Sequence, residues 1–335
     1  MSNTPKTWHA KSFWERNRKS GGYLLRSTSK RAIVNILRAL LMFGLCFMIL
    51  QPILSKISIS LMSEKDIYDT TVIVLPRNPT TLNYTLTSHL MSYPTALMNT
   101  ILISFITAVL QVAACTLVGY GFARYDFPLK RIWFACVILV IIVPPQVIST
   151  SLHVNFRFFD VFGIFNAIQG QPLNLRKTIT PYLLMSMTCM GLKDGLYIYM
   201  LRQYFRGVPK SLEEAAYVDG CGSLHTFVRV MLPDALPILT SCFLFAFVWQ
   251  WTDIFYSNTF MGTATLLSGE LSRIAMRLSQ YMADTQNASG SSVSIARQQQ
   301  IIGTGVLMST FPLIILYIFA QRGFVESLSM TGIKM

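Results

Sequence analysis

Charged residues are scarce in this chain. Asp, Glu, Lys and Arg make up 13% of its 335 residues, about half of the roughly 25% that is usual in soluble domains. Hydrophobic residues make up 52%, and the mean hydropathy is +0.47. This composition excludes an ordinary soluble domain, because much of the chain must avoid water. It predicts an integral membrane protein, and the length fits one membrane domain.

The chain also has few groups suited to catalysis or metal binding. Its four histidines (His9, His89, His153 and His225) show no metal-site spacing, and no paired carboxylates lie near a helix end. It contains no phosphate-binding loop of the form Gly-x-x-x-x-Gly-Lys-Ser/Thr. The charged ring or filter sequence of an ion channel is not visible either. We therefore expect no enzyme, no metal and no cofactor in this chain, although a membrane enzyme or an ion channel remains the alternative class.

Six apolar segments are long enough to cross a bilayer, which takes about 20 residues. The second of them contains no charged residue. Together they predict an all-α integral membrane protein with six transmembrane helices. The six segments are 39–57, 95–122, 132–152, 179–201, 235–251 and 301–320.

Basic residues are distributed unevenly between the connecting segments. Nine of the 28 Lys and Arg residues lie in 1–38. If residues 1–38 are placed in the cytoplasm, the inner connecting segments hold 18 Lys and Arg residues, and the longer outer segments hold nine. Positively charged segments stay on the cytoplasmic side during insertion. We therefore expect cytoplasmic tails at 1–38 and 321–335, an external loop at 58–94, and a bacterial cytoplasmic membrane. The basic tail is a topology signal that also attracts anionic lipid, rather than an arm for nucleic acid.

Paired prolines and charged residues interrupt the third and fourth segments. Pro144 and Pro145 predict a break in the third, where the freed backbone groups must face protein or a cavity. Lys193 and Asp194 lie inside the fourth, where a charge facing lipid is costly. This pair predicts either a local kink or a pairing with a second chain. Outside the spans, the polar segment 283–299 predicts a flexible loop.

The inner segment 207–233 has a distinctive pattern. Ser211 and Glu214 have the spacing of a capping box, in which each side chain accepts a hydrogen bond from the other residue's amide. Gly220 suits a left-handed position after the helix. We therefore expect a two-turn helix over 212–219. A second short helix is expected to begin at Ser223 and end at Leu232-Pro233.

The complete spacing resembles the signature loop of bacterial ABC import permeases. That loop has Glu-Ala-Ala, three residues, Gly, nine residues, an aliphatic residue, any residue, Leu and Pro, and Val230 supplies the aliphatic residue here. The resemblance implies a type-1 ABC importer permease fold, and a coupling loop at 207–233 that docks into a groove on an ATPase subunit, the subunit that binds ATP. It implies that the ATPase-coupling residues are Glu213, Glu214, Ala215, Ala216, Asp219, Gly220, Leu232 and Pro233.

The resemblance extends over about residues 90 to 335 and is to maltose-type carbohydrate ABC importer permeases. It implies a permease domain at 95–320 that forms half of the pathway for a sugar or oligosaccharide, with another polar solute as the alternative. The implied partners are a second homologous permease, an ATPase subunit dimer and an extracellular solute-binding protein. Thr252 departs from the Asn common in the family. The matching sequences are Tyr120-Gly121-Phe122-Ala123-Arg124, Pro144-Pro145-Gln146, Leu201-Arg202-Gln203-Tyr204-Phe205 and Trp249-Gln250-Trp251-Thr252-Asp253.

Aromatic residues gather at the end of the fifth segment. Trp249, Trp251, Asp253 and Tyr256 are the candidate substrate-pathway residues. An aromatic belt at the membrane interface is one interpretation of this cluster. In the other, the rings stack on sugar rings and Asp253 accepts hydrogen bonds from hydroxyl groups.

Overall fold

The computed structural model describes residues 23–69, 71–72, 75–161, 163–262, 264–286 and 293–332. Parts of four predicted segments lie outside these residues, namely 1–22 of the basic tail, 70 and 73–74 of the external loop, 287–292 of the polar loop and 333–335 of the second tail. The described residues are helical apart from connecting segments and one isolated bridge between Phe159 and Leu173. The predicted all-α class is confirmed.

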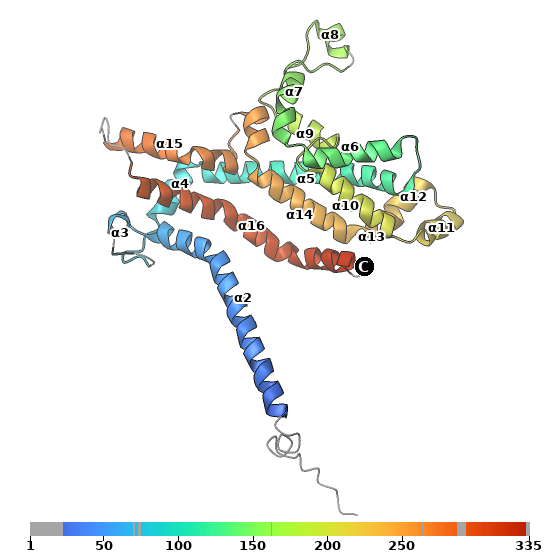
Figure 1. Ribbon diagram of the computed structural model, residues 1–335. Coiled ribbons are helices and arrows are strands. Elements are labelled where there is room, and N and C mark those ends of the chain that lie inside the picture. The colour runs from blue at the N-terminus through green and yellow to red at the C-terminus, as the bar shows by residue number, and fades with distance from the viewer. Residues whose placement is uncertain are drawn as a thin grey trace, which may run out of the picture. The chain divides into compact units, whose positions relative to one another are not determined.

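The chain divides into two compact units, Met1–Ser58 and Ile59–Met335. Most of helix α2 (Tyr23–Leu61) lies in the first unit, and this helix contains the predicted span 39–57. The second unit holds all the other helices (Figure 1). They are α3 (Glu64–Tyr68), α4 (Leu82–Leu90), α5 (Tyr93–Arg124), α6 (Lys130–Ile142), α7 (Pro145–Arg157), α8 (Ile164–Gln169), α9 (Thr180–Met187), α10 (Asp194–Gly207), α11 (Ser211–Val218), α12 (Ser223–Thr226), the π-helix η1 (Phe227–Met231), α13 (Leu232–Asp234), α14 (Leu236–Thr252), the π-helix η2 (Ser257–Met261), α15 (Leu267–Gln286) and α16 (Ile295–Gly332).

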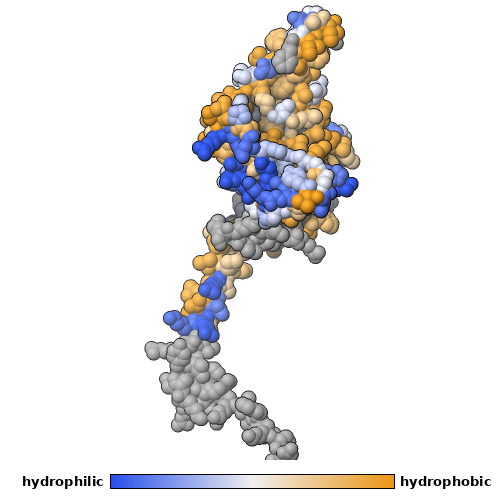
Figure 2. Space-filling model, turned by 90° about the vertical axis from the view of Figure 1, so that its right-hand side faces the viewer, coloured by the Kyte–Doolittle hydropathy of each residue, from blue (hydrophilic) through white to orange (hydrophobic). Residues whose placement is uncertain are grey.

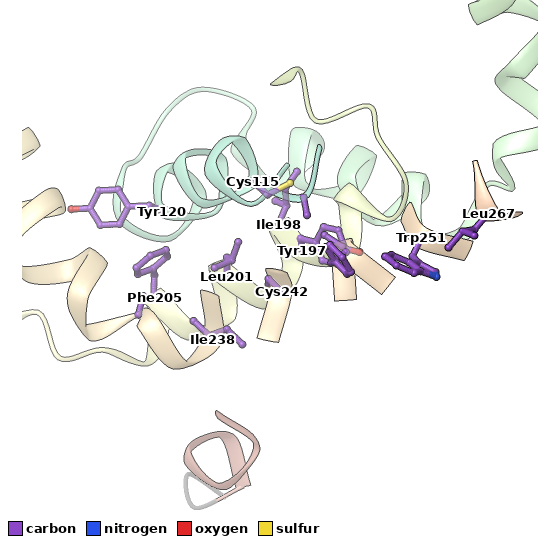
Figure 3. Packing of buried hydrophobic residues seen from close by; sticks show 14 of the residues in the cluster. Cys115, Tyr120, Tyr197, Ile198, Leu201, Phe205, Ile238, Cys242, Trp251 and Leu267 are labelled. Atoms are coloured by element: carbon purple, nitrogen blue, oxygen red, sulfur yellow. The ribbon is translucent and has the colours of Figure 1, made fainter. Parts of the chain in front are cut away.

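Helix α5 is the centre of the second unit, and α10 and α14 pack along it. Small residues allow this close packing: a Cβ atom added at Gly119 would lie 2.9 Å from the Cβ atom of Leu201 on α10. Figure 3 shows the side chains that fill the space between the three helices. Those labelled on them are Cys115 and Tyr120 from α5, Tyr197, Ile198, Leu201 and Phe205 from α10, and Ile238, Cys242 and Trp251 from α14.

Replacing Gly119 with leucine is expected to push α5 away from α10 and to destabilise the purified chain. Overpacking of this kind costs about 1–3 kcal/mol. Gly121 is the matched control, because a Cβ atom there meets nothing within 4 Å. A thermal melt of the detergent-purified variants measures the difference. Equal midpoints for Gly119→Leu and Gly121→Leu would show that the two helices do not approach closely at this point.

Three helical segments in the described part of the chain are long and apolar enough to cross a membrane: 29–61, Tyr93–Arg124 and Ile295–Gln321. Two bent pairs, α6 with α7 and the segment Ser223–Asp234 with α14, raise the number to five if each pair is one span. The predicted count of six therefore stays a prediction.

The predicted break at Pro144-Pro145 is present, because α6 and α7 meet there at an angle of 103°. The predicted fourth span, 179–201, is not continuous. It is divided between α9 and α10 by residues 188–193, and Lys193 adopts a left-handed backbone with φ of 65°. The kink expected beside Asp194 is thus a complete interruption of the helix.

Helix α15 has no counterpart among the predicted spans. Ile274 and Leu278 on it are buried against the core. Glu270 is 2% exposed and forms ion pairs with Arg273 at 3.1 Å and with Arg277. The Arg277 guanidinium also donates to the carbonyl of Leu90, at 2.6 Å. Two cations that the sequence assigns to the outer side therefore serve to hold α15 in place.

Candidate coupling site and translocation path

Helix α11 ends as the sequence predicts. Gly220 follows it with φ of 83°, a left-handed conformation that glycine adopts without strain. The amide of Gly220 donates to the carbonyl of Tyr217 at 3.0 Å, and the amide of Cys221 donates to that of Ala216 at 2.9 Å. These two bonds form a Schellman motif, which satisfies carbonyls that a helix end leaves free. The turn after α11 is therefore fixed by hydrogen bonds.

The start of α11 differs from the prediction. The helix begins at Ser211, with Lys210 as the N-cap residue, and no side-chain capping bond forms. The amide of Glu214 donates to the carbonyl of Lys210 at 3.1 Å instead of to the Ser211 hydroxyl. The predicted capping box is therefore wrong, because Ser211 lies one position inside the helix and not at its cap.

Glu213 holds α11 against the end of α5. One of its carboxylate oxygens lies 2.9 Å from Arg124 Nε and accepts from the Tyr120 hydroxyl at 3.1 Å. Arg124 also donates to the carbonyl of Val208 at 2.8 Å, in the segment that leads into α11. The Arg124 and Glu213 side chains are 6% and 10% exposed. This buried pair ties the coupling loop to the central helix.

The opposite face of α11 is exposed. Glu214, Ala215 and Asp219 lie on it, and Val218 is 88% exposed. Figure 2 shows the end of the second unit that carries this loop, where hydrophilic residues gather on the surface. The predicted coupling residues in α11 thus lie on two different faces of the helix. Glu213 and Ala216 face the protein, and the other α11 residues of the set face outward.

The second short helix begins at Ser223, as predicted. It continues through α12, η1 and α13 to Asp234 and then meets α14 at 76°. A hydrogen bond joins the hydroxyls of Ser223 and Tyr125, and Phe227 packs on the ring of Tyr120. Leu232 is half-buried and Pro233 exposed. Both halves of the coupling loop are therefore anchored at the end of α5.

The four candidate pathway residues differ in their surroundings. Trp249 is 45% exposed, whereas Trp251 and Tyr256 are 4% and 2% exposed. Trp251 donates to the carbonyl of Ser309 on α16 at 3.1 Å. The carboxylate of Asp253 accepts from the Ser257 amide at 2.9 Å, and from the Tyr256 amide and the Tyr182 hydroxyl. Of the four, Trp249 therefore has the most surface free for another molecule.

Two helix breaks border one cavity of about 130 Å³. Pro145 lines it from the first break, and Gly191 and Lys193 line it from the second, together with Tyr256. The Lys193 ammonium lies 4.9 Å from the centre of the Trp249 ring, a cation–π distance. Irregular backbone within a membrane domain is tolerated where it lines a cavity. Lys193 and Trp249 therefore lie together beside a hollow between broken helices.

A buried polar cluster lies behind this cavity. Asp194 is fully buried, and its carboxylate accepts from the Gly191 amide at 2.6 Å. Gln111 on α5 donates to the carbonyl of Leu192 at 3.3 Å. These bonds hold the interruption of the fourth predicted span against α5.

Sequence reasoning missed the roles of Tyr120, Arg124 and Lys193 in these two sites. Tyr120 and Arg124 are part of the sequence 120–124, on which the resemblance to permeases partly rests, but the sequence alone does not show that they contact Glu213. The contact joins residues that are 89 or more positions apart, and it depends on how α5 and the coupling loop pack. The sequence predicts a kink or a pairing with a second chain at Lys193, and only the structure shows its approach to Trp249.

Comparison with known proteins gives relatives of the kind that the sequence predicts. A probable ABC transporter permease protein of Pyrococcus horikoshii is 29% identical over 165 residues, 49% of this chain and 54% of that protein. The trehalose transport system permease protein of Mycobacterium tuberculosis is 27% identical over 242 residues, 72% of this chain and 77% of that protein. The chain therefore spans about half of the first relative and three quarters of the second.

One solved structure shows the fold. It is a crystal structure of a bacterial ABC transporter involved in the import of the acidic polysaccharide alginate. Its matching chain has a TM-score of 0.66 and 20% sequence identity, and the alignment covers 88% of this chain and 97% of that chain. The predicted type-1 ABC importer permease fold is confirmed.

A protein-family model settles the membership. The model for binding-protein-dependent transport system inner membrane components matches residues 115–328. That range contains the broken helices, the predicted coupling loop, α14, α15 and most of α16. The predicted resemblance to ABC importer permeases is confirmed, and the chain belongs to the family of binding-protein-dependent transport system inner membrane components.

Proposed function

We propose that this chain is the permease subunit of an ATP-driven, binding-protein-dependent importer for a sugar or oligosaccharide. It forms half of the translocation pathway with a second homologous permease. ATP is bound and hydrolysed by a separate ATPase dimer, and an extracellular binding protein delivers the solute. The chain binds no cofactor itself, and both of its ends face the cytoplasm of a bacterial cell. The observation that carries this proposal is the coupling loop, anchored on one face and exposed on the other.

The anchored face explains how movement would pass into the membrane domain. A partner that binds the exposed face of α11 would act on α5 through the Glu213–Arg124 pair and through Phe227. Helix α5 packs against α10 and α14, so all three helices would respond together. The loop then couples the ATPase to the pathway by rigid contact, with no flexible linker between them.

The sugar assignment is supported by the relatives and by the cavity beside Lys193. One relative is named as a trehalose permease, and the alginate importer takes up a polysaccharide. An exposed tryptophan gives a flat surface of the kind that sugar rings stack on. Trp249 is 45% exposed, and the ammonium of Lys193, which lines the cavity between the broken helices, lies 4.9 Å from the centre of its ring. We propose that Trp249 and Lys193 line the solute pathway, and that Trp251, Asp253 and Tyr256 support them from inside the protein.

A pulldown of the tagged chain from its native membrane in mild detergent tests this function. Mass spectrometry is expected to find an ATPase with a phosphate-binding loop and a second permease of the same family. Uptake assays with labelled sugars would then identify the solute, with an amino acid as the comparison for another polar solute. Recovery of the folded chain alone would contradict the importer assignment.

The proposed orientation predicts that Cys221 is reached by thiol reagents only from the cytoplasm. The residue is half-buried in the coupling loop. With exposed Cys46 and Cys136 and half-buried Cys189 replaced by serine, a membrane-impermeant maleimide should label Cys221 in inverted vesicles and not in intact cells. Leu75→Cys is the matched control, because Leu75 is 78% exposed in the predicted external loop and should be labelled from outside. Labelling of Cys221 in intact cells would reverse the topology.

A further inference from the structure

A second cavity, of about 590 Å³, opens where α5, the α5–α6 connection and α10 come together. Six of its ten lining residues are basic, and Asp126 is the acidic one among the ten. The positive charges come from three separate segments of the chain, and they converge on a single hollow. The basic residues are Arg124, Lys130, Arg131, Arg202, Arg206 and Lys210.

Two of these six charges are already paired. Arg124 pairs with Glu213, and Lys130 lies 3.0 Å from Asp126 and donates to the carbonyl of Tyr125. The Asp126 side chain is 99% exposed, so it neutralises the cavity poorly. Within the described ranges, no ion pair forms to the other four cations. Like charges gathered in this way repel one another, and an anion between them would remove the repulsion.

Arg202 differs from the cations in the connecting segments, because it lies within a helix. It lies within α10, and its guanidinium carbon is 3.7 Å from the centre of the Phe134 ring on α6. Its Nε atom is buried and has no hydrogen-bond partner. A topology signal needs only cations in the loops, where they face water. A guanidinium that stacks on a ring and lines the cavity is suited to a ligand oxygen.

A further hollow of about 470 Å³ adjoins this cavity, and three of its six lining residues are apolar. The two hollows share Asp126, Lys130 and Arg131, and the second adds apolar residues of the α5–α6 connection and the start of α6. Of these, Leu129 is 62% exposed and Ile132 59% exposed. None of the residues in α6 is buried. A ligand that fits both hollows carries a negative headgroup and a hydrocarbon chain.

We propose that this cavity binds the headgroup of an anionic phospholipid of the inner leaflet. The phosphate would lie between Arg131, Arg202 and Arg206, and an acyl chain would follow Leu129 and Ile132 along α6. The site lies at the predicted inner ends of three membrane helices, the depth at which headgroups are found. It is separate from the exposed face of α11, and it does not depend on which solute the importer carries.

The test uses the full chain purified in mild detergent, with phosphatidylglycerol or phosphatidylcholine added and native mass spectrometry to count bound lipids. The wild-type chain is expected to retain phosphatidylglycerol in preference to phosphatidylcholine. In the double variant Arg131→Gln/Arg206→Gln, binding of phosphatidylglycerol should weaken by at least tenfold, since each charge lost costs about fivefold. The control is Arg229→Gln, which removes an exposed cation of η1 that lines neither hollow.

Three results would overturn the proposal. These are equal retention of the two lipids, equal retention by the double variant and the wild type, and an equal loss in Arg229→Gln. Inorganic phosphate distinguishes the two sources of the anion. If phosphate alone binds as tightly as the lipid and is lost in the same variant, the cavity is a phosphate site and the lipid assignment is wrong. The single variant Arg131→Gln, at an exposed side chain, replaces the double variant if the latter does not fold.

Discussion

Replacing Glu214 with lysine is expected to abolish solute uptake and leave the chain folded and inserted. Glu214 is exposed on α11, and no hydrogen bond or ion pair to another described residue holds its side chain. Its carboxylate is therefore available to the ATPase subunit, and the opposite charge there would oppose docking. Uptake and ATP hydrolysis by the reconstituted complex measure the effect. Uptake should fall to background, and hydrolysis should no longer respond to the loaded binding protein.

A further variant shows whether the loss comes from docking. Glu214→Gln removes the charge without reversing it and should give an intermediate uptake. Normal uptake by Glu214→Lys in a complex that still contains the ATPase would remove Glu214 from the docking surface.

Replacing Glu213 with glutamine is expected to lower the stability of the folded chain, in contrast to the replacement of Glu214. The change leaves the Arg124 guanidinium, 6% exposed, without its carboxylate. Breaking a buried pair by removing one partner costs about 3–5 kcal/mol. The measurement is the denaturation midpoint of the purified chain, with Glu214→Gln as the matched control on the neighbouring residue. A large fall is expected for Glu213→Gln and none for Glu214→Gln.

A double-mutant cycle separates the pair from its surroundings. Arg124→Met together with Glu213→Met removes both charges and keeps apolar volume, so much of the lost stability should return. If the double variant is as unstable as the sum of the single variants, the two side chains do not interact. The stabilisation of α11 would then come from Tyr120 and the Val208 carbonyl instead.

The turn after α11 and the start of the second short helix could be predicted from the sequence because their determinants are local. Gly220 has the position that a left-handed helix end requires, and Pro233 lies at the end of the second short helix. The capping box failed because the same spacing fits a helix that begins one residue earlier, at Ser211. Which carboxylate faces inward could not be read from the sequence. Glu213 and Glu214 are adjacent, and only the packing of α11 against α5 distinguishes them.

The broken and amphipathic helices were harder to predict. The Pro144-Pro145 break has a covalent cause, and it was predicted correctly. The interruption at 188–193 is held by contacts between Asp194, Gly191 and Gln111, which hydropathy does not register. Helix α15 was missed because it is too polar for a span. Its apolar positions, such as Ile274 and Leu278, do follow a helical spacing that could have revealed it.

The sequence gives the number of basic residues in each segment, but it does not give their positions in the folded protein. The sequence shows that cations are concentrated in the predicted inner segments, and that pattern predicts orientation. It does not show that Arg131, Arg202 and Arg206 surround one cavity, or that Arg273 and Arg277 meet the buried Glu270. These arrangements depend on long-range packing around α5. The same residue type therefore contributes to the predicted topology, to internal pairing and to the proposed lipid site.

Site-specific photo-cross-linking from Val218 tests the central claim most directly. Val218 is 88% exposed on α11, and a photoreactive amino acid there in the intact membrane should capture the proposed ATPase subunit. The same probe at Trp133, 56% exposed at the start of α6, is the control and should not capture it. A cross-link from Val218 to a protein with a phosphate-binding loop is the predicted result. Cross-links from Val218 to lipid or to an external protein alone would contradict the assignment of this loop as the coupling site.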